Sequence, residues 1–290
     1  LKTQSIIYCI VREKDNQSAL ERLSQKLAFY FDDDIQNYHD RIVMITGNIL
    51  DTNFGLSSQQ YHSLGTTIDA IIDSAALVKH YGEYEEFDNI NVKGTEKIVE
   101  FCKKYNIPLH YISTLSVSGY GLVKTSKTQF TEKNFYIGQE YNDNVYVKSK
   151  FEAEKLILNA CKYNNLYASI YRVGNMTNRY SDGKFQENAD ENAFLNRITS
   201  IINLRCIPEE LLSLPIEFTP VDICANFMVE LFLSKKENNL DIYHLFNNNY
   251  TDFNLIFKIL RNYNIYIETS SIKNFEKKIL NGKDNYFGII

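Results

Sequence analysis

The sequence predicts an α/β protein with a doubly wound parallel sheet and a smaller carboxyl-terminal lobe. In residues 1–175, short apolar runs of strand length alternate with amphipathic helical segments. This alternation is typical of parallel strands joined by right-handed helical crossovers. Hydrophobic residues make up 44% of the 290-residue chain, which is enough for a sizeable core.

Five apolar runs are the expected strands of the sheet. They are residues 5–11, 41–46, 68–76, 109–116 and 166–173. Continuous apolar runs are typical of strands covered on both faces. Helices are expected between them over 20–30, 84–105 and 146–163, where apolar residues recur at helical spacing.

The pattern loosens after Gly174, where a polar loop over 174–183 begins. We therefore divide the chain into a sheet domain, residues 1–175, and a mixed lobe, residues 176–290, some of whose elements return to the sheet. In the lobe, helices are expected over 192–202, 222–233, 253–263 and 273–280, and strands over 242–246 and 266–272.

A hydroxyl at a strand end and a Tyr–Lys pair on a helix form the main functional pattern. Thr114 lies near the end of the run that begins at Leu109, and Tyr146 and Lys150 are four residues apart, so they share a helix face. The Lys150 ammonium is expected to lower the pKa of Tyr146 from about 10, so that Tyr146 exchanges a proton near neutral pH. In a chain with 21 Tyr, a chance Tyr-x-x-x-Lys is the alternative, but the order of strand, hydroxyls, loop and helix favours catalysis.

Other classes of function have little support in the composition. The net charge is −5, so we expect no nucleic-acid partner. Neither the five Cys nor the five His show metal-ligand spacing, and no apolar run approaches the roughly 18 residues of a membrane span. No secretion signal is visible. We therefore expect no metal, no membrane and a cytoplasmic location.

Several segments, in order and spacing, resemble the extended short-chain dehydrogenase/reductase superfamily. Within it, the chain resembles the thioester reductase branch, which includes the terminal reductase domains of nonribosomal peptide synthetases and is related to carboxylic acid reductases and fatty acyl-CoA reductases. The segments that carry the resemblance are residues 7–12, 73–78, 91–95, 111–117, 146–156, 171–175, 179–183 and 219–222.

The resemblance implies a Rossmann-like fold and reductive release of a thioester. Residues 1–175 would bind NADPH, and residues 176–290 would contact the substrate, which is an acyl or peptidyl group on the phosphopantetheine of a carrier protein, or an acyl-CoA. Thr114 and Tyr146 would hold the thioester carbonyl, and Lys150 would bind the nicotinamide ribose. The product would be an aldehyde or an alcohol. The remaining cofactor-binding residues would be Arg12, Arg22, Asn48, Ile49, Ala75 and Ala76.

The end of the first predicted strand favours NADPH over NADH. NAD enzymes usually place a carboxylate there for the ribose 2′-hydroxyl, whereas this chain has Arg12, with Arg22 on the next helix. A guanidinium suits a 2′-phosphate. Two alternatives stay open: Glu13 could act as the carboxylate, and Arg22 could lie on a solvated helix face.

The chain departs from the superfamily at its beginning. The first glycine is Gly47, so the first strand and its glycine-rich, phosphate-binding turn are missing. We expect an open seam in the sheet, a fragment of a longer polypeptide, and weak or absent NADPH binding and activity for this chain alone. Two other functions are considered: a nucleotide-sugar epimerase or dehydratase of the same superfamily, and a non-catalytic module that docks a carrier protein.

Overall fold

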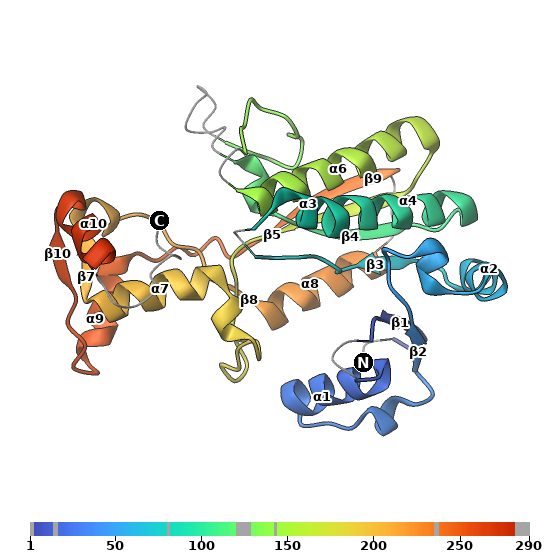
Figure 1. Ribbon diagram of the computed structural model, residues 1–290, viewed down its shortest axis with the longest axis horizontal. Coiled ribbons are helices and arrows are strands. Elements are labelled where there is room, and N and C mark those ends of the chain that lie inside the picture. Colours follow the sequence, from blue (N-terminus) through green and yellow to red (C-terminus); the bar gives the residue numbers. More distant parts are fainter. Residues whose placement is uncertain are drawn as a thin grey trace.

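The central sheet has four parallel strands. The computed structural model describes residues 3–13, 17–79, 82–119, 129–141, 144–234 and 238–281. Neighbouring strands pair in the order β3 (Ile71–Asp73), β4 (Leu109–Thr114), β5 (Ala168–Val173) and β9 (Leu240–Leu245). Helices α4 (Gly94–Tyr105) and α6 (Val145–Asn164) cover one face, and α8 (Val221–Leu233) lies on the other (Figure 1). The predicted α/β architecture with a parallel sheet is confirmed.

A second parallel sheet contains only β1 (Ile7–Val11) and β2 (Ile42–Thr46). It lies beside β3 in Figure 1, but among the described residues no ladder joins β1 to β3. The two sheets still share one core, because Tyr8, Ile10 and Ile45 pack against its buried residues. Among the described residues, β1 and β2 therefore form a separate pair that contributes side chains to the core of the central sheet.

Strand alternation explains which side chains enter the main core. Leu109 and Tyr111 of β4, and Ala168 and Ile170 of β5, belong to the core cluster, to which α4 and α6 also contribute. The intervening residues point to the opposite face. There the buried His110 lies 4.6 Å from Phe232 of α8, measured between ring centroids.

The predicted helix over 84–105 has an irregular middle. It consists of α3 (Tyr84–Phe87), a π-helical turn (Asp88–Lys93) and α4. The turn contains Asn91, whose side chain bonds both backbone groups of Leu77. These bonds, and one from the Ala75 amide to the Asp73 carboxylate, replace strand pairing after Asp73. For this reason β3 is shorter than the predicted strand over 68–76.

Two further helices accompany β1 and β2. Helix α1 (Ala19–Phe31) begins with a capping box, in which Ser18 and Glu21 bond each other's backbone amides. Helix α2 (Ser58–Thr67) begins in the same way at Ser57 and Gln60. The periodicity of the sequence did not predict α2.

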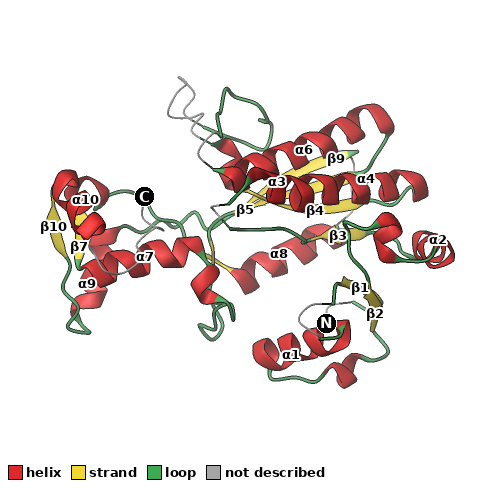
Figure 2. Cartoon of the chain, viewed as in Figure 1, coloured by secondary structure: helices red, strands yellow, loops and turns green. Residues whose placement is uncertain are grey.

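The carboxyl-terminal lobe has a core of its own, built around Ile201, Ile207, Phe253 and Phe257. Figure 2 shows its small β-sheet at the opposite end of the molecule from β1 and β2. Helix α8 and strand β9 return from this part of the chain to the main sheet. The division at residue 175 stays a prediction. The elements of the lobe are α7 (Ala193–Leu204), β7 (Cys206–Pro208), α9 (Phe253–Arg261), β10 (Glu268–Ser270) and α10 (Ile272–Asn281), and the short pair β6 (Met176–Thr177) and β8 (Thr219–Pro220) precedes α8.

The described residues contain neither a helix that could cross a membrane nor a cluster of metal ligands. No helix in these ranges has both the length and the hydrophobicity that crossing a membrane requires. No group of three or more His, Cys, Asp or Glu side chains in them could hold a metal ion.

Candidate functional site

Thr114 and Tyr146 meet at the carboxyl end of β4. Thr114 is the last residue of the strand, and its hydroxyl accepts a hydrogen bond of 3.1 Å from the Ser116 amide. Tyr146 lies in the first turn of α6, which begins after the N-cap Asn144. The Thr114 and Tyr146 side chains are hydrogen-bonded to each other. A substrate oxygen placed at this pair would meet two hydroxyl groups.

Lys150 lies one turn further along α6 and is 4% exposed. Its Nζ donates hydrogen bonds to the Tyr111 hydroxyl at 3.1 Å and to the Ile112 carbonyl oxygen at 2.7 Å. The ammonium is therefore tied to β4, the strand that also carries Thr114. The structure thus brings the three predicted catalytic residues to one end of β4 and α6.

The predicted lowering of the pKa of Tyr146 is wrong for this structure. Burial raises the pKa of Tyr146 from 10.0 to about 12, and the hydrogen bond with Thr114 opposes this only in part. Burial disfavours the charged phenolate, and the Lys150 ammonium is directed toward Tyr111 and Ile112. Tyr146 is consequently a protonated hydrogen-bond donor at neutral pH, which suits protonation of an oxygen better than proton abstraction.

Burial also lowers the pKa of Lys150, from 10.5 to about 8, and the charges of Asp73 and Glu154 oppose this. The Glu154 carboxylate is engaged elsewhere. It accepts hydrogen bonds from the Arg172 guanidinium at 2.7, 3.1 and 3.2 Å and from the Ser113 hydroxyl at 2.5 Å. Both members of this ion pair are fully buried. A network of buried charges therefore lies beneath the Thr114–Tyr146 pair.

Asn91 connects this site to the loop after β3. Its Nδ2 donates to the Ser149 hydroxyl at 2.8 Å, and that hydroxyl donates to the Tyr146 carbonyl oxygen at 2.7 Å. Its side chain also bonds the Leu77 backbone, as described above. In this structure Asn91 therefore ties the loop after β3 to helix α6.

Arg12 and Arg22 come together at the end of β1. Arg12 follows the strand and is exposed, and Arg22 lies on α1 with its guanidinium hydrogen-bonded to the Arg12 carbonyl oxygen. Arg22 is half-buried and bonded to the backbone, so it does not lie on a freely solvated helix face. This bond to the backbone holds the two arginine residues together at this strand end.

The other predicted cofactor residues lie in the loops after β2 and β3. The Asn48 Oδ1 accepts the Leu50 amide at 3.1 Å and so shapes the turn after β2. Ile49 packs on the main core and against Gly94. A Cβ at position 94 would lie 2.8 Å from the Ile49 side chain, so this position leaves no room for a side chain. Ala75 and Ala76 follow β3 and are exposed and half-buried, respectively.

The loop 179–183 is fastened to the start of α8. Asp222 accepts the Tyr180 and Ser181 amides at 2.8 and 3.1 Å, and these bonds lower its pKa from 3.8 to about 2. Arg179 forms an ion pair with Asp182 across the loop. Further along, the Glu187 amide donates to the Tyr30 hydroxyl of α1 at 3.0 Å. The carboxyl-terminal half therefore contacts the helix that carries Arg22.

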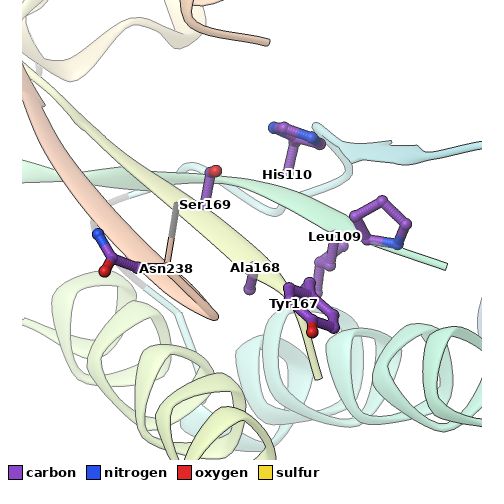
Figure 3. A pocket seen from close by; sticks show the side chains of 7 residues that line it. Leu109, His110, Tyr167, Ala168, Ser169 and Asn238 are labelled. Carbon is purple, nitrogen blue, oxygen red and sulfur yellow. The ribbon is translucent and has the colours of Figure 1, made fainter. Parts of the chain in front are cut away.

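A pocket of about 200 Å³ lies away from this site, at the amino ends of β4 and β5 (Figure 3). Its lining is mainly apolar, and its His110 is bonded through Nδ1 to the Tyr171 hydroxyl at 2.8 Å. Ligands of parallel sheets bind at the carboxyl ends of the strands. We therefore assign the candidate site to Thr114 and Tyr146 and not to this pocket.

Sequence reasoning missed four buried polar residues of the site. Three had a detectable signal: Glu154 is four residues after Lys150, on the same helix face, and Arg172 interrupts an apolar strand. Asp73 likewise interrupts an apolar run, whereas Tyr111 had no signal, because it fits a buried strand.

Comparisons with known proteins identify the family of the chain. The model of an NAD-binding family described as "Male sterility protein" matches residues 1–228. A linear gramicidin synthase of Brevibacillus parabrevis is 28% identical over 265 residues, which are 90% of this chain and 5% of that protein. This chain thus spans a small part of that relative.

Solved structures are similar over nearly the whole chain. A thiolation-reductase di-domain from an archaeal non-ribosomal peptide synthetase has a TM-score of 0.85 and 32% identity, over 99% of this chain and 60% of that one. The terminal R domain from the myxalamid PKS-NRPS pathway has a TM-score of 0.84 and 26% identity, over 99% and 71% of the two chains.

An epimerase is similar in fold alone. UDP-glucuronic acid 4-epimerase from Bacillus cereus has a TM-score of 0.60 at 17% identity, over 85% of this chain and 76% of that one. The reductase domains are thus more similar in both structure and sequence. The chain belongs to the NAD-binding family described as "Male sterility protein", in the Rossmann-like, extended short-chain dehydrogenase/reductase superfamily and in its branch of thioester reductase domains.

Proposed function

We propose that this chain is the catalytic part of an NADPH-dependent reductase that releases an acyl or peptidyl thioester from a carrier protein, or from CoA, as an aldehyde or alcohol. The observation that carries the proposal is the hydrogen-bonded Thr114–Tyr146 pair at the carboxyl end of β4. Relatives named as reductase domains of peptide synthetases support the type of reaction.

Thr114 and Tyr146 act on the carbonyl oxygen of the thioester. Reduction of the carbonyl carbon builds negative charge on this oxygen, and donors aimed at it stabilise the transition state. Tyr146 has its pKa raised to about 12 and is fully protonated at neutral pH, so it can give its proton to the oxygen. Thr114 holds the oxygen in place with a second hydroxyl.

The residues present fit two ends of the nicotinamide cofactor. Arg12 and Arg22 would hold the 2′-phosphate, and Lys150 would hold the nicotinamide ribose once its bonds to Tyr111 and Ile112 rearrange. The bound nicotinamide would supply a hydride. No glycine precedes Gly47 in this sequence, so no glycine-rich turn beside β1 is assigned to the cofactor pyrophosphate.

The substrate is proposed to reach the site on a flexible arm. The archaeal structure at 32% identity contains a thiolation domain together with its reductase domain. A phosphopantetheine-bound thioester is therefore the first choice of substrate, and acyl-CoA, which carries the same arm, is the second. We propose that the loop 179–187, which is hydrogen-bonded to Asp222 of α8 and to Tyr30 of α1, contacts this arm.

The test is NADPH oxidation with an acyl-pantetheine thioester, in protein preceded by a glycine-rich strand and turn. Tyr146→Phe removes only the hydroxyl, so folding and NADPH binding should survive, while turnover falls by roughly 10²–10⁴, the scale for a lost general acid. Tyr163→Phe is the control, since Tyr163 is an exposed tyrosine of the same helix.

The outcomes separate this function from the alternatives. Near-full turnover in Tyr146→Phe would refute the assignment of the site. A non-catalytic docking module would bind no NADPH even when the upstream turn is present. An epimerase would retain NAD tightly through purification and would not oxidise NADPH with a thioester.

A further inference from the structure

We propose that Asp73 is a positioning residue, whose carboxylate acts as the counter-charge that keeps Lys150 protonated and tied to β4. Asp73 ends β3, directly opposite Tyr111 of β4 in the parallel register. Its side chain is buried, with 3% exposed. The inference rests on the proposed function only for what Lys150 does in the reaction.

The Asp73 carboxylate is only partly used by its neighbours. Oδ1 accepts the Ala75 amide at 3.1 Å. Oδ2 is buried and has no hydrogen-bond partner among the described residues. Thr95 lies near the carboxyl group, but its hydroxyl donates its hydrogen to the Asn91 carbonyl oxygen at 2.7 Å. Burying a carboxylate oxygen without a hydrogen-bond partner costs free energy. A positive charge near Oδ2 would offset this cost.

The Lys150 ammonium is the charge that meets this requirement. Burial raises the pKa of the Asp73 carboxyl and lowers that of Lys150, and the opposite charge of each group counteracts this effect on the other. Tyr111 lies beside both groups, since it pairs with Asp73 in the sheet and its hydroxyl accepts a hydrogen bond from the Lys150 Nζ at 3.1 Å. An ammonium has three donors, and two of them are accounted for by Tyr111 and Ile112.

The surrounding charges assign this role to Asp73 and not to Glu154. The described titratable groups around Lys150 and Asp73 are Asp73 on β3, Tyr111 on β4, Cys102 on α4, and Tyr146 and Glu154 on α6. Burial raises the pKa values of Tyr111, Tyr146 and Cys102, so these groups are neutral at pH 7. The Glu154 carboxylate is neutralised by its three hydrogen bonds with Arg172. Asp73 is therefore the carboxylate left to balance Lys150.

The consequence for the reaction is a defined state of Lys150 near neutral pH. Without Asp73, an ammonium in a dry site loses its proton more easily. Neutral Lys150 would bind a ribose hydroxyl less strongly. Asp73 thus acts through Lys150 and touches no substrate atom.

The first test measures the pKa of Lys150 by NMR, from the chemical shift of its Cε as a function of pH. The Cε signal is assigned to Lys150 by its absence in Lys150→Met. Asp73→Asn keeps the shape and removes the charge, so the pKa of Lys150 should fall by about one pH unit or more, within the roughly 1–3 units of a nearby opposite charge. Asp69→Asn, an exposed change of equal charge just before β3, should leave it unchanged. Equal pKa values in Asp73→Asn and the unchanged protein would overturn the proposal.

The second test covers the case in which Asp73→Asn folds poorly. Lys150→Met leaves the Asp73 carboxylate buried without its counter-charge, and should destabilise the protein. Adding Asp73→Asn to Lys150→Met should then restore stability, whereas two independent residues would give additive losses. Additive losses in urea unfolding would overturn the coupling.

Neither test requires activity, so both remain decisive if the proposed reductase function fails. In an active protein, the alkaline limb of the pH–rate profile should also move to lower pH in Asp73→Asn. If the pKa of Lys150 falls in Asp73→Asn but the alkaline limb of the pH–rate profile does not move, Asp73 sets the charge of Lys150 without affecting the reaction. This result would contradict the role of Asp73 in the reaction.

Discussion

Replacing Arg172 by Met should be among the most destabilising single changes in the described part of the protein. Arg172 and Glu154 are both fully buried and share three hydrogen bonds of 2.7–3.2 Å. Arg172 also donates to the Asn134 carbonyl oxygen at 3.0 Å, which fastens the segment before α6. Removing one partner of a buried ion pair leaves an unpaired charge and costs about 3–5 kcal/mol.

The assay is urea unfolding followed by far-ultraviolet circular dichroism. Lys155→Met is the matched control, because Lys155 pairs with Glu152 on the same helix at 3.5 Å but both side chains are substantially exposed. Such a surface pair contributes about 0–1 kcal/mol. If Arg172→Met costs no more than Lys155→Met, the reasoning about burial is refuted.

A double change distinguishes the lost ion pair from lost packing. Arg172→Met together with Glu154→Leu removes both charges, and apolar replacements of buried ion pairs are often neutral. The double variant should therefore be more stable than Arg172→Met alone. A further loss in the double variant would mean that packing, including the guanidinium contact with the Phe130 ring at 4.7 Å, dominates.

The remaining predictions concern the cofactor and pH. Arg12→Ala, in protein that contains the upstream turn, should narrow the preference for NADPH over NADH by about 1–3 kcal/mol, the range for hydrogen bonds to a charged group; an unchanged ratio of the two kcat/KM values would show that Arg12 does not contact the phosphate. Since the pKa of Lys150 is about 8 instead of 10.5, its ammonium is lost as pH rises through 8, and turnover should fall there. Between pH 8 and 10.5 the folded protein binds fewer protons at Lys150 than the unfolded chain does. The contribution of Lys150 to the free energy of unfolding should therefore rise with pH in this window. Urea unfolding of Lys150→Met should lack this rise.

Local patterns were sufficient to predict most of the sheet domain and the three residues of the candidate site. Strands and helices there follow from short-range periodicity, and the i, i+4 spacing of Tyr146 and Lys150 places both on one helix face wherever the helix lies. Helix α2 escaped prediction, because its capping box precedes a segment of weak periodicity. The residue at which β3 ends was also not predicted. The hydrogen bonds that replace strand pairing there come from Asn91, which lies in another element.

The sequence by itself determined the positions of the strands in the sheet domain, the family, and the residues that the carboxyl ends of these strands would present. The charge state of the site was decided by tertiary structure alone. A pKa depends on how much water is removed and which charges lie nearby, and only the packing of α6 on β4 sets these for Tyr146 and Lys150. In the same way, Asp73 is one polar residue in an apolar run until the parallel register places it opposite Tyr111, whose hydroxyl accepts a hydrogen bond from Lys150.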